Sequence, residues 1–231
     1  MAVDKQGRNE RPRLPSDVYR DLKASAGGEL ERVAADYAAA GEALERRDVA
    51  RAVTLLRRCK ERASRSAAVR EALGIALYLD GSFRDAQREL SAYRRMSGRL
   101  DQNHLLADCA RAVGQPDKAE ALVAEMMRAD VPADRIAEGL MVIAGARSDA
   151  GDHRAALAAL HRVDLAPAEV QPYHLRLWYL AAELHEKLGE HAKAAQLFDS
   201  ITTIDPDFLD AADRAAASSG RAGGGQAGSN G

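Results

Sequence analysis

Small residues recur in pairs twelve positions apart, five times along the 231-residue chain. Four of these pairs enclose a glycine, and an arginine stands at that place in the first pair. Small residues let two helix backbones approach closely, and glycine suits the left-handed turn that ends a helix. The spacing therefore predicts short antiparallel helix pairs repeated in tandem. The pairs are Ala40 and Ala52, Gly74 and Ala86, Ala107 and Ala119, Ala144 and Ala156, and Ala182 and Ala194, and they enclose Arg47, Gly81, Gly114, Gly151 and Gly189.

Apolar residues accompany these pairs at helical spacing. Each second small site is followed four residues later by an apolar side chain: Leu56, Leu90, Val123, Leu160 and Phe198. Spacing of three and four places such residues on one helix face. The polar residue after each turn can cap the second helix of its pair. We expect five units at residues 33–66, 67–99, 100–133, 137–170 and 175–208.

The composition agrees with a helical fold. Alanine is abundant and aromatic residues make up only 4% of the chain. Strands favour β-branched and aromatic residues, whereas Ala, Leu, Arg and Glu are strong helix formers. The fold class predicted from composition and repeat together is all-α.

The two ends of the chain differ from the repeats. Residues 1–15 are polar and are expected to be disordered. Ser16 or Asp17 can cap a short helix through Ala26, with Val18 and Leu22 covering the first repeat. A closing helix is expected over 207–217, and the Gly/Ser-rich residues 218–231 are expected to form a flexible tail. We predict one solenoid domain over 16–217, with caps at 16–32 and 207–217.

Charge and cysteine usage give general expectations. The net charge is −2, yet residues 54–100 carry 11 basic and 5 acidic side chains. Cys59 and Cys109 lie on apolar stripes without a Cys-x-x-Cys motif, so we expect buried free thiols. The first residues lack an apolar signal core, and no run of about 18 apolar residues could span a membrane. We therefore expect a cytoplasmic protein without a membrane partner.

No arrangement of residues indicates catalysis, a cofactor or a metal. The nucleophile elbow and the glycine-rich phosphate loops are missing from the sequence. His104 and Asp108 have metal-ligand spacing, but a helical ion pair explains them without a third ligand. Glu183, Glu186 and Glu190 can share a face, either as acid/base groups or as ordinary exposed carboxylates. His153 and His191, after the turns, are expected to be structural.

The repeat resembles the tetratricopeptide repeat (TPR) family. In the last unit the family's motif positions are matched by Trp178, Ala182, Gly189, Ala194, Phe198 and Pro206. In the second unit they are matched by Leu73, Gly74, Phe83, Ala86 and Leu90. The tryptophan site holds other residues elsewhere, and extra residues at 134–136 and 171–174 separate the last units. The resemblance implies a right-handed α-solenoid of about five helix-turn-helix repeats with short capping helices.

A narrower resemblance rests on the residues 69–78, 94–98 and 106–109. These stretches look like a family of small cytosolic TPR proteins from high-GC Gram-positive bacteria, to which no activity is assigned. The resemblance covers about residues 30–210 and implies no catalytic residue.

The TPR resemblance also implies which residues face a partner. In that family the first helix of each unit lines a concave groove that binds a peptide or a helix. Such an acidic lining with aromatic anchors suits a segment with Lys or Arg beside apolar side chains, although these residues could also be ordinary solvated helix charges. The groove residues implied are Tyr37, Glu71, Ile75, Tyr78, Asp101, His104, Asp108, Arg111, Glu138, Met141, Tyr179, Glu183 and Glu186.

The second helices carry the basic excess of the chain. Two alternatives to groove binding therefore stay open, and only the first of them uses this basic surface. The first is a nucleic-acid- or ribosome-associated accessory protein that uses this surface, and the second is a self-associating scaffold. The favoured interpretation is a non-catalytic adaptor, monomeric or weakly oligomeric, that binds a protein or peptide. The basic residues are Arg57, Arg58, Lys60, Arg62, Arg65, Arg84, Arg88, Arg94, Arg95 and Arg99.

Overall fold

The computed structural model describes residues 14–224, with side chains through 222. Within these residues it has twelve α-helices, one short 3₁₀ helix and no strand, which confirms the all-α prediction. The chain divides into two compact units, which meet in sequence between Val113 and Gly114.

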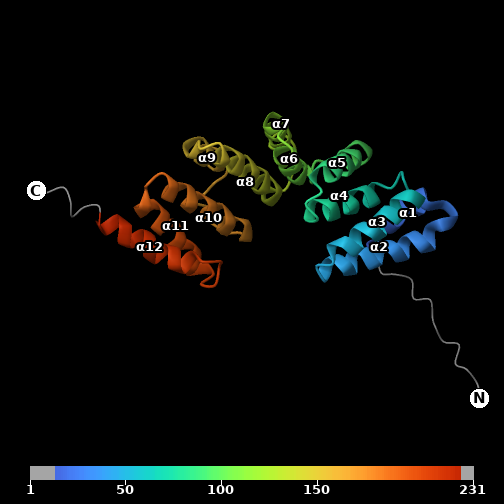
Figure 1. Ribbon diagram of the computed structural model, residues 1–231, viewed down its shortest axis with the longest axis horizontal. Helices are drawn as coiled ribbons and strands as arrows, with labels where there is room; N and C mark the ends of the chain where they lie inside the picture. Colours follow the sequence, from blue (N-terminus) through green and yellow to red (C-terminus); the bar gives the residue numbers. More distant parts are fainter. Residues whose placement is uncertain (1–13, 225–231) are drawn as a thin grey trace, which may run out of the picture. The chain divides into compact units, whose positions relative to one another are not determined.

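Unit 1 consists of two antiparallel helix pairs with one further helix at each end (Figure 1). Helix α2 pairs with α3 and α4 pairs with α5, while α3 and α4 pack on each other. Helix α1 lies against α2 and α4, and α6 lies against α5. The bounds are α1 Ser16–Ala26, α2 Leu30–Glu45, α3 Val49–Arg62, α4 Ala67–Leu79, α5 Phe83–Ser97 and α6 Asn103–Ala112, with a 3₁₀ turn at Gly27–Glu29.

Unit 2 repeats the same arrangement of paired helices (Figure 1). Helix α7 packs on α8, α8 pairs with α9, and α10 pairs with α11. The last helix, α12, packs along α11. The bounds are α7 Pro116–Met126, α8 Ala133–Asp149, α9 His153–Leu160, α10 Pro172–Lys187, α11 His191–Ile204 and α12 Ala211–Gly224.

The predicted turns lie where expected. All five central residues adopt the left-handed backbone conformation, with φ between 61° and 82°. The left-handed conformation costs glycine little conformational energy. Arg47 adopts it as well, at φ 61°, so the first repeat keeps the turn without a glycine. Asp48 and Asp152 cap the following helices by accepting from the N–H groups of Arg51 and Ala155. Ser82, Gln115 and Glu190 make no such side-chain cap, contrary to the prediction.

Small residues permit close helix packing within both units. All ten small-site residues are buried. A Cβ added at Gly74 of α4 would lie 2.7 Å from Leu90 Cγ on α5, a distance that side chains do not tolerate. A Cβ at Gly139 of α8 would lie 3.1 Å from Val123 on α7. The neighbouring helix, and not the backbone conformation, therefore favours glycine at Gly74, and at Gly139 a Cβ would make a tight contact.

Each unit has a core at its outer end. In unit 1, Leu22 of α1 packs with Val33 and Cys59 of the first pair, as its predicted covering role requires. In unit 2, Trp178 and Phe198 share a cluster with the alanines of α12. The indole Nε1 of Trp178 donates to the carbonyl of Leu165 at 2.8 Å, so the one polar atom of this side chain is satisfied.

Helix α1 also supplies a cap that the sequence did not reveal. The carboxylate of Asp21 accepts hydrogen bonds from the Ser66 hydroxyl and from the backbone N–H groups of Ala67 and Ala68, at 3.3 and 3.2 Å. These N–H groups open α4 and have no partner within that helix. Asp21, which lies 45 residues before Ser66, therefore supplies hydrogen-bond acceptors for the first turn of α4.

Several expectations about the ends need correction. The closing helix begins at Ala211 and not at 207, and it continues to Gly224, so residues 218–224 are helical and not a flexible tail. Residues 1–13 and 225–231, for which disorder was expected, lie outside the described residues. Ser16 and Asp17 do not cap α1, which begins at Ser16 itself and ends at Ala26 as predicted. The single domain over 16–217 stays a prediction.

Candidate functional site

A small hollow lies between α2 and α4 of unit 1. It measures about 180 Å³, and most of its lining surface is apolar. Three of its lining residues, Tyr37, Glu71 and Ile75, are among the groove residues predicted from the sequence. We call it the α2–α4 hollow, and it is lined by Tyr37, Ala40, Gly41, Leu44, Leu56, Glu71, Ala72 and Ile75.

The hollow exists because its walls are small. Ala40 and Gly41 on α2 face Ala72 on α4, and no atom lies within 4 Å of the place where a Cβ on Gly41 would stand. The second helix of the pair, α3, adds the buried side chain of Leu56 to the lining. Small side chains that allow close helix packing thus also leave this space unfilled.

Glu71 brings a carboxylate to the apolar lining. Its side chain accepts a hydrogen bond from Gln102 Nε2 at 2.8 Å. Burial raises the pKa of this carboxyl above its ordinary value, although the Gln102 hydrogen bond opposes the shift. A charged carboxylate that is partly withdrawn from water gains more from a cationic neighbour than an exposed one does.

Glu71 also lines a second, shallower hollow. This hollow of about 140 Å³ adjoins α1, α4 and α5, and its lining is mostly polar in residue type. Asp21, which caps α4, belongs to it, as does Arg99. Glu71 is therefore the residue common to an apolar hollow and a charged one. The lining is Asp17, Val18, Asp21, Ala67, Ala68, Glu71, Tyr93, Ser97 and Arg99.

The remaining predicted groove residues of unit 1 are mostly paired with one another. Asp108 accepts from the Tyr78 hydroxyl at 2.7 Å and from Arg111 Nε at 2.8 Å. Asp101 accepts from the Tyr93 hydroxyl at 2.9 Å and pairs with Arg99 at 2.7 Å. Their carboxylates are already engaged within the chain.

The ion pair expected between His104 and Asp108 stays a prediction. The histidine side chain is buried. In the described residues 14–224, no group of three or more His, Cys, Asp or Glu side chains is arranged to hold a metal ion.

In unit 2 the predicted groove residues meet a partner from their own chain. Arg214 of α12 donates to Glu183 Oε1 at 2.8 Å, to the Tyr179 hydroxyl at 3.0 Å and to Glu186. Its guanidinium carbon lies 5.2 Å from the Tyr179 ring centroid and 4.9 Å from that of Phe198, within cation–π range. We call Tyr179, Glu183, Glu186, Phe198 and Arg214 the α10–α12 site.

Further contacts hold the α10–α12 site together. The Tyr179 hydroxyl donates to Asp210 at 2.5 Å, and Ser218 donates to Glu186 Oε1 at 2.6 Å. Burial alone would raise the pKa of Glu186, but the hydrogen bonds from Ser218 and Arg214 outweigh it and lower that pKa. The two remaining predicted residues of unit 2 lie on α8, where Glu138 pairs with Arg176 and Met141 is half-buried.

The α2–α4 hollow and the α10–α12 site occupy corresponding places in the repeat. Tyr37 and Tyr179 each stand three residues before a small site on the first helix. Leu56 and Phe198 each stand four residues beyond the small site on the second helix. In both cases the next helix along the chain supplies the facing residue, Glu71 from α4 or Arg214 from α12.

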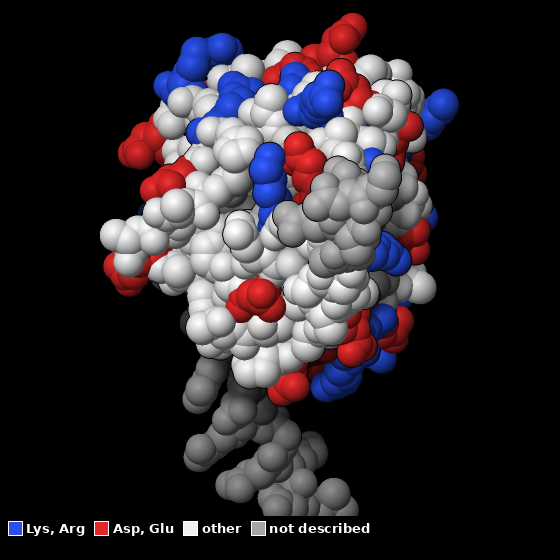
Figure 2. Space-filling view, turned by 90° about the vertical axis from the view of Figure 1, so that its left-hand side faces the viewer, with Lys and Arg blue, Asp and Glu red and all other residues white. Residues whose placement is uncertain are grey.

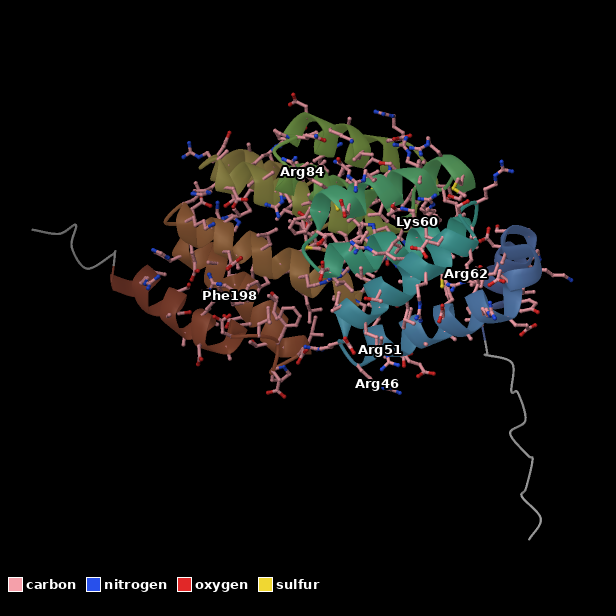
Figure 3. All side chains as sticks on the ribbon, turned by 45° about the vertical axis from the view of Figure 1, so that its right-hand side comes forward. Arg46, Arg51, Lys60, Arg62, Arg84 and Phe198 are labelled. Carbon is pink, nitrogen blue, oxygen red and sulfur yellow. The ribbon has the colours of Figure 1, made fainter. Side chains whose placement is uncertain are left out.

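The basic surface predicted on α3 and α5 is largely neutralised by acidic neighbours. Figure 3 shows Lys60 and Arg62 on α3 and Arg84 on α5. Lys60 lies 2.6 Å from Glu89, and Arg62 lies 3.5 Å from Glu29. Ion pairs of this set also include Arg62–Asp36, Arg57–Asp85, Arg58–Asp36, Arg88–Asp85 and Arg99–Asp101.

A third hollow of unit 1 has the buried carboxylate of Glu89 in its lining. Glu89 is only 6% exposed, and its two oxygens accept from Lys60 and Arg70, each at 2.6 Å. Lys60 and Glu89 border this polar hollow of about 430 Å³ between α3 and α5. Basic and acidic side chains are also interspersed on the side of the molecule that Figure 2 presents. A nucleic-acid surface would need several uncompensated cations, which this pairing reduces.

The two cysteines are not candidate nucleophiles. Both thiols are fully buried, as predicted from their apolar stripes. Burial raises the pKa of each to about 12, and a thiol of that kind is unreactive at neutral pH.

Sequence reasoning missed Arg214, the residue that organises the α10–α12 site. The chain continues after α11 with one more helix in the place of a sixth first helix, and Arg214 lies on it 35 residues after Tyr179, which is about one repeat length. Extending the repeat register beyond residue 208 would have placed it beside α10.

Comparisons with known proteins agree with the repeat. No protein-family model matches the chain, and a search of curated proteins finds no match either. No helix among the described residues is long and apolar enough to cross a membrane. Among solved structures, the chain resembles YrrB, described as a TPR protein with an unusual peptide-binding site. The identity is 17% over 77% of this chain and 89% of that one, with a TM-score of 0.50.

A second solved structure with some likeness is the TPR domain of P58(IPK). Its identity to this chain is 18%, its TM-score is 0.43, and the match covers 82% of this chain and 56% of that one. The first likeness, together with the paired helices and their left-handed turns, identifies the architecture. This chain has the fold of the tetratricopeptide repeat proteins, an α-solenoid of helix-turn-helix repeats.

Proposed function

We propose that the chain is a non-catalytic adaptor that binds an extended or helical segment of a partner protein, with the α2–α4 hollow as the anchor point. The observation that carries the proposal is an open apolar hollow on the face where the sequence predicts a groove. A partner's apolar side chain would enter it and lose its contact with water, the main source of affinity at such anchors.

The size of the hollow favours a side chain over a metabolite. Pockets for small molecules usually measure roughly 300–1,000 Å³, whereas the α2–α4 hollow measures about 180 Å³. One leucine, methionine or phenylalanine side chain is the kind of group that fits such a volume. Selectivity for a protein segment would then come from its neighbouring residues.

Glu71 supplies that selectivity in the proposal. Its carboxylate lies at the junction of the apolar hollow and the charged hollow. A lysine or arginine beside the anchor residue of the partner would pair with it. The expected ligand is thus an apolar residue followed or preceded by a basic one, as the acidic groove predicted from the sequence suggests.

A substitution that fills the hollow tests the proposal. Gly41→Leu places a side chain in the unoccupied space and replaces a glycine inside a helix, so the fold should be kept. Gly145→Leu on α8 is the matched control, because a Cβ there also meets nothing within 4 Å. Circular dichroism and thermal melting confirm that both variants are folded.

The binding measurement uses an immobilised positional-scanning peptide library. Pools with a fixed Leu, Met or Phe beside Arg should be retained by the wild type and by Gly145→Leu, and about tenfold less by Gly41→Leu. Glu71→Gln should bind the apolar residue but lose the preference for Arg beside it. Equal retention by wild type and Gly41→Leu would refute the anchor role of the hollow.

Neither alternative function gains an observation of its own. At least six of the ten basic residues proposed for a nucleic-acid surface form ion pairs. Self-association stays a prediction that light scattering over a concentration series would test.

A further inference from the structure

Few side chains of helix α12 are themselves buried, although two of them lie in the core cluster of Trp178 and Phe198. Within residues 211–222, the buried side chains are Ala211, Ala215 and Ser218. Alanine and serine bury little apolar surface, so they contribute little hydrophobic stabilisation. The larger side chain on this face is Arg214, which reaches over Phe198 and Tyr179.

Arg214 makes the specific contacts of the docked helix. It bonds to two carboxylates, Glu183 and Glu186, and lies over two aromatic rings. Arginine is suited to this combination because its planar guanidinium stacks on rings while its N–H groups fork to carboxylates. The α10 face therefore recognises an arginine, and α12 is the segment that supplies it.

The connection before α12 has the features of a hinge. Leu209 adopts a left-handed backbone conformation at φ 48°, which costs energy for a residue other than glycine. Its side chain is 72% exposed although it is large and apolar. While α12 is packed on unit 2, Leu209 stays in this unfavourable backbone conformation. The strain would be released if α12 dissociated from α10 and α11.

From these observations we infer that the α10–α12 site is a binding site for arginine-bearing helical segments, which α12 occupies from within the chain and a partner segment of the same chemistry replaces. The partner is a helix with one arginine between small residues on the same face. The spacing Ala211, Arg214, Ala215, Ser218 gives its pattern as small-x-x-Arg-small-x-x-small. This site is distinct from the α2–α4 hollow and does not depend on it.

The test uses α12 itself as the probe. A fluorescent peptide of residues 207–222 is titrated into the full chain and into the full-length variant Arg214→Gln, whose own helix has lost its anchor. The peptide should bind the variant about tenfold more tightly than the wild type, because the competing internal helix is weakened. The same peptide with glutamine in place of its arginine should bind neither chain.

Two further variants control for the charges. Arg176→Gln removes another ion pair of unit 2, with Glu138, away from α12. It should bind the peptide as weakly as the wild type does. Adding Glu186→Gln to Arg214→Gln should reduce peptide binding about tenfold. Binding to Arg214→Gln no tighter than to wild type, or binding indifferent to Glu186, would overturn the inference.

Hydrogen exchange on the unaltered chain gives an independent measurement. The amides of α12 should exchange faster than those of α10 and α11, because α12 opens by itself. Saturating peptide should accelerate exchange in residues 211–222 and leave α11 protected. If α12 exchanges in step with α11, and the peptide changes nothing, the helix is a fixed part of the fold and the inference fails.

Discussion

The α2–α4 hollow and the α10–α12 site use the same repeat positions for opposite purposes. In unit 1, Gly41 and Leu44 leave an apolar space beside Tyr37. In unit 2, the places one and four residues after the small site hold Glu183 and Glu186, and a guanidinium fills the space beside Tyr179. The repeat thus determines the backbone and the buried small residues, while a few variable positions decide whether a site is open or closed.

The largest expected loss of stability comes from Phe198, whose ring lies against the Arg214 guanidinium in the α10–α12 site. Phe198→Ala removes a fully buried ring and should destabilise unit 2 by about 3–5 kcal/mol. It should also loosen α12, because Arg214 loses one of its two stacking partners. Chemical denaturation together with exchange rates of residues 211–222 measures both effects. Leu56→Ala, at the corresponding place in unit 1, should destabilise that unit without releasing a helix.

Two glycines of unit 1 test whether the hollow is really open. Gly74→Ala puts a methyl group against Leu90 on α5 and should destabilise by about 1–3 kcal/mol. Gly41→Ala meets no atom and should stabilise α2 by about 0.5–1 kcal/mol. Thermal melting of both variants gives the comparison. A loss of stability for Gly41→Ala would mean that the wall of the hollow is packed more tightly than described.

The two corresponding tyrosines sharpen the difference between the sites. Tyr179→Phe deletes a hydroxyl that donates to Asp210 and accepts from Arg214, and should cost about 1 kcal/mol. Tyr37 makes no comparable contact among the hydrogen bonds found in the described residues, so Tyr37→Phe should change stability little. Equal costs for the two substitutions would contradict the contrast drawn between the sites.

The smallest effects are expected from pH, and they have opposite signs. The pKa of Glu71 is raised, so its contribution to stability is present below the ordinary glutamate value and is lost as pH rises through the raised pKa. The pKa of Glu186 is lowered, so its contribution is present at neutral pH and is lost as pH falls through that lowered pKa.

Carboxyl NMR titration of the two residues checks this pair. Glu71 should titrate above an ordinary glutamate and Glu186 below it. Acidification should therefore loosen α12 while it leaves the first helix pairs intact. The reverse order of the two midpoints would show that the buried environments have been assigned wrongly.

Much of the fold could be predicted because its determinants are local. The turns at Gly81 and Gly151, and the faces carrying Leu90 and Phe198, follow from spacings of at most twelve residues. Bounds of helices are local as well, and the end of α1 at Ala26 was predicted to the residue. The end of α12 was not, since the Gly/Ser-rich residues after 217 have weak helix propensity and their helix rests on packing against α11.

The candidate sites were only partly predictable because they depend on contacts between helices. The sequence indicated that Tyr179, Glu183 and Glu186 share a face, and the structure places them on one side of α10. It did not indicate that Arg214 would reach that face, or that Glu71 and Tyr37 would border an empty space. Such outcomes depend on how far each helix slides along its neighbour, which periodicity within a helix does not encode.

Asp21 has a consequence for how this chain can be shortened. A version that starts at Leu30 would keep both helix pairs of unit 1 intact in sequence, yet α4 would begin with amide groups that have lost their acceptor. Val69, which packs with Leu22, would become accessible to solvent at the same time. Helix α1 thus stabilises the second helix pair as well as the first. A shortened protein that begins at the first repeat would lose stability in both pairs.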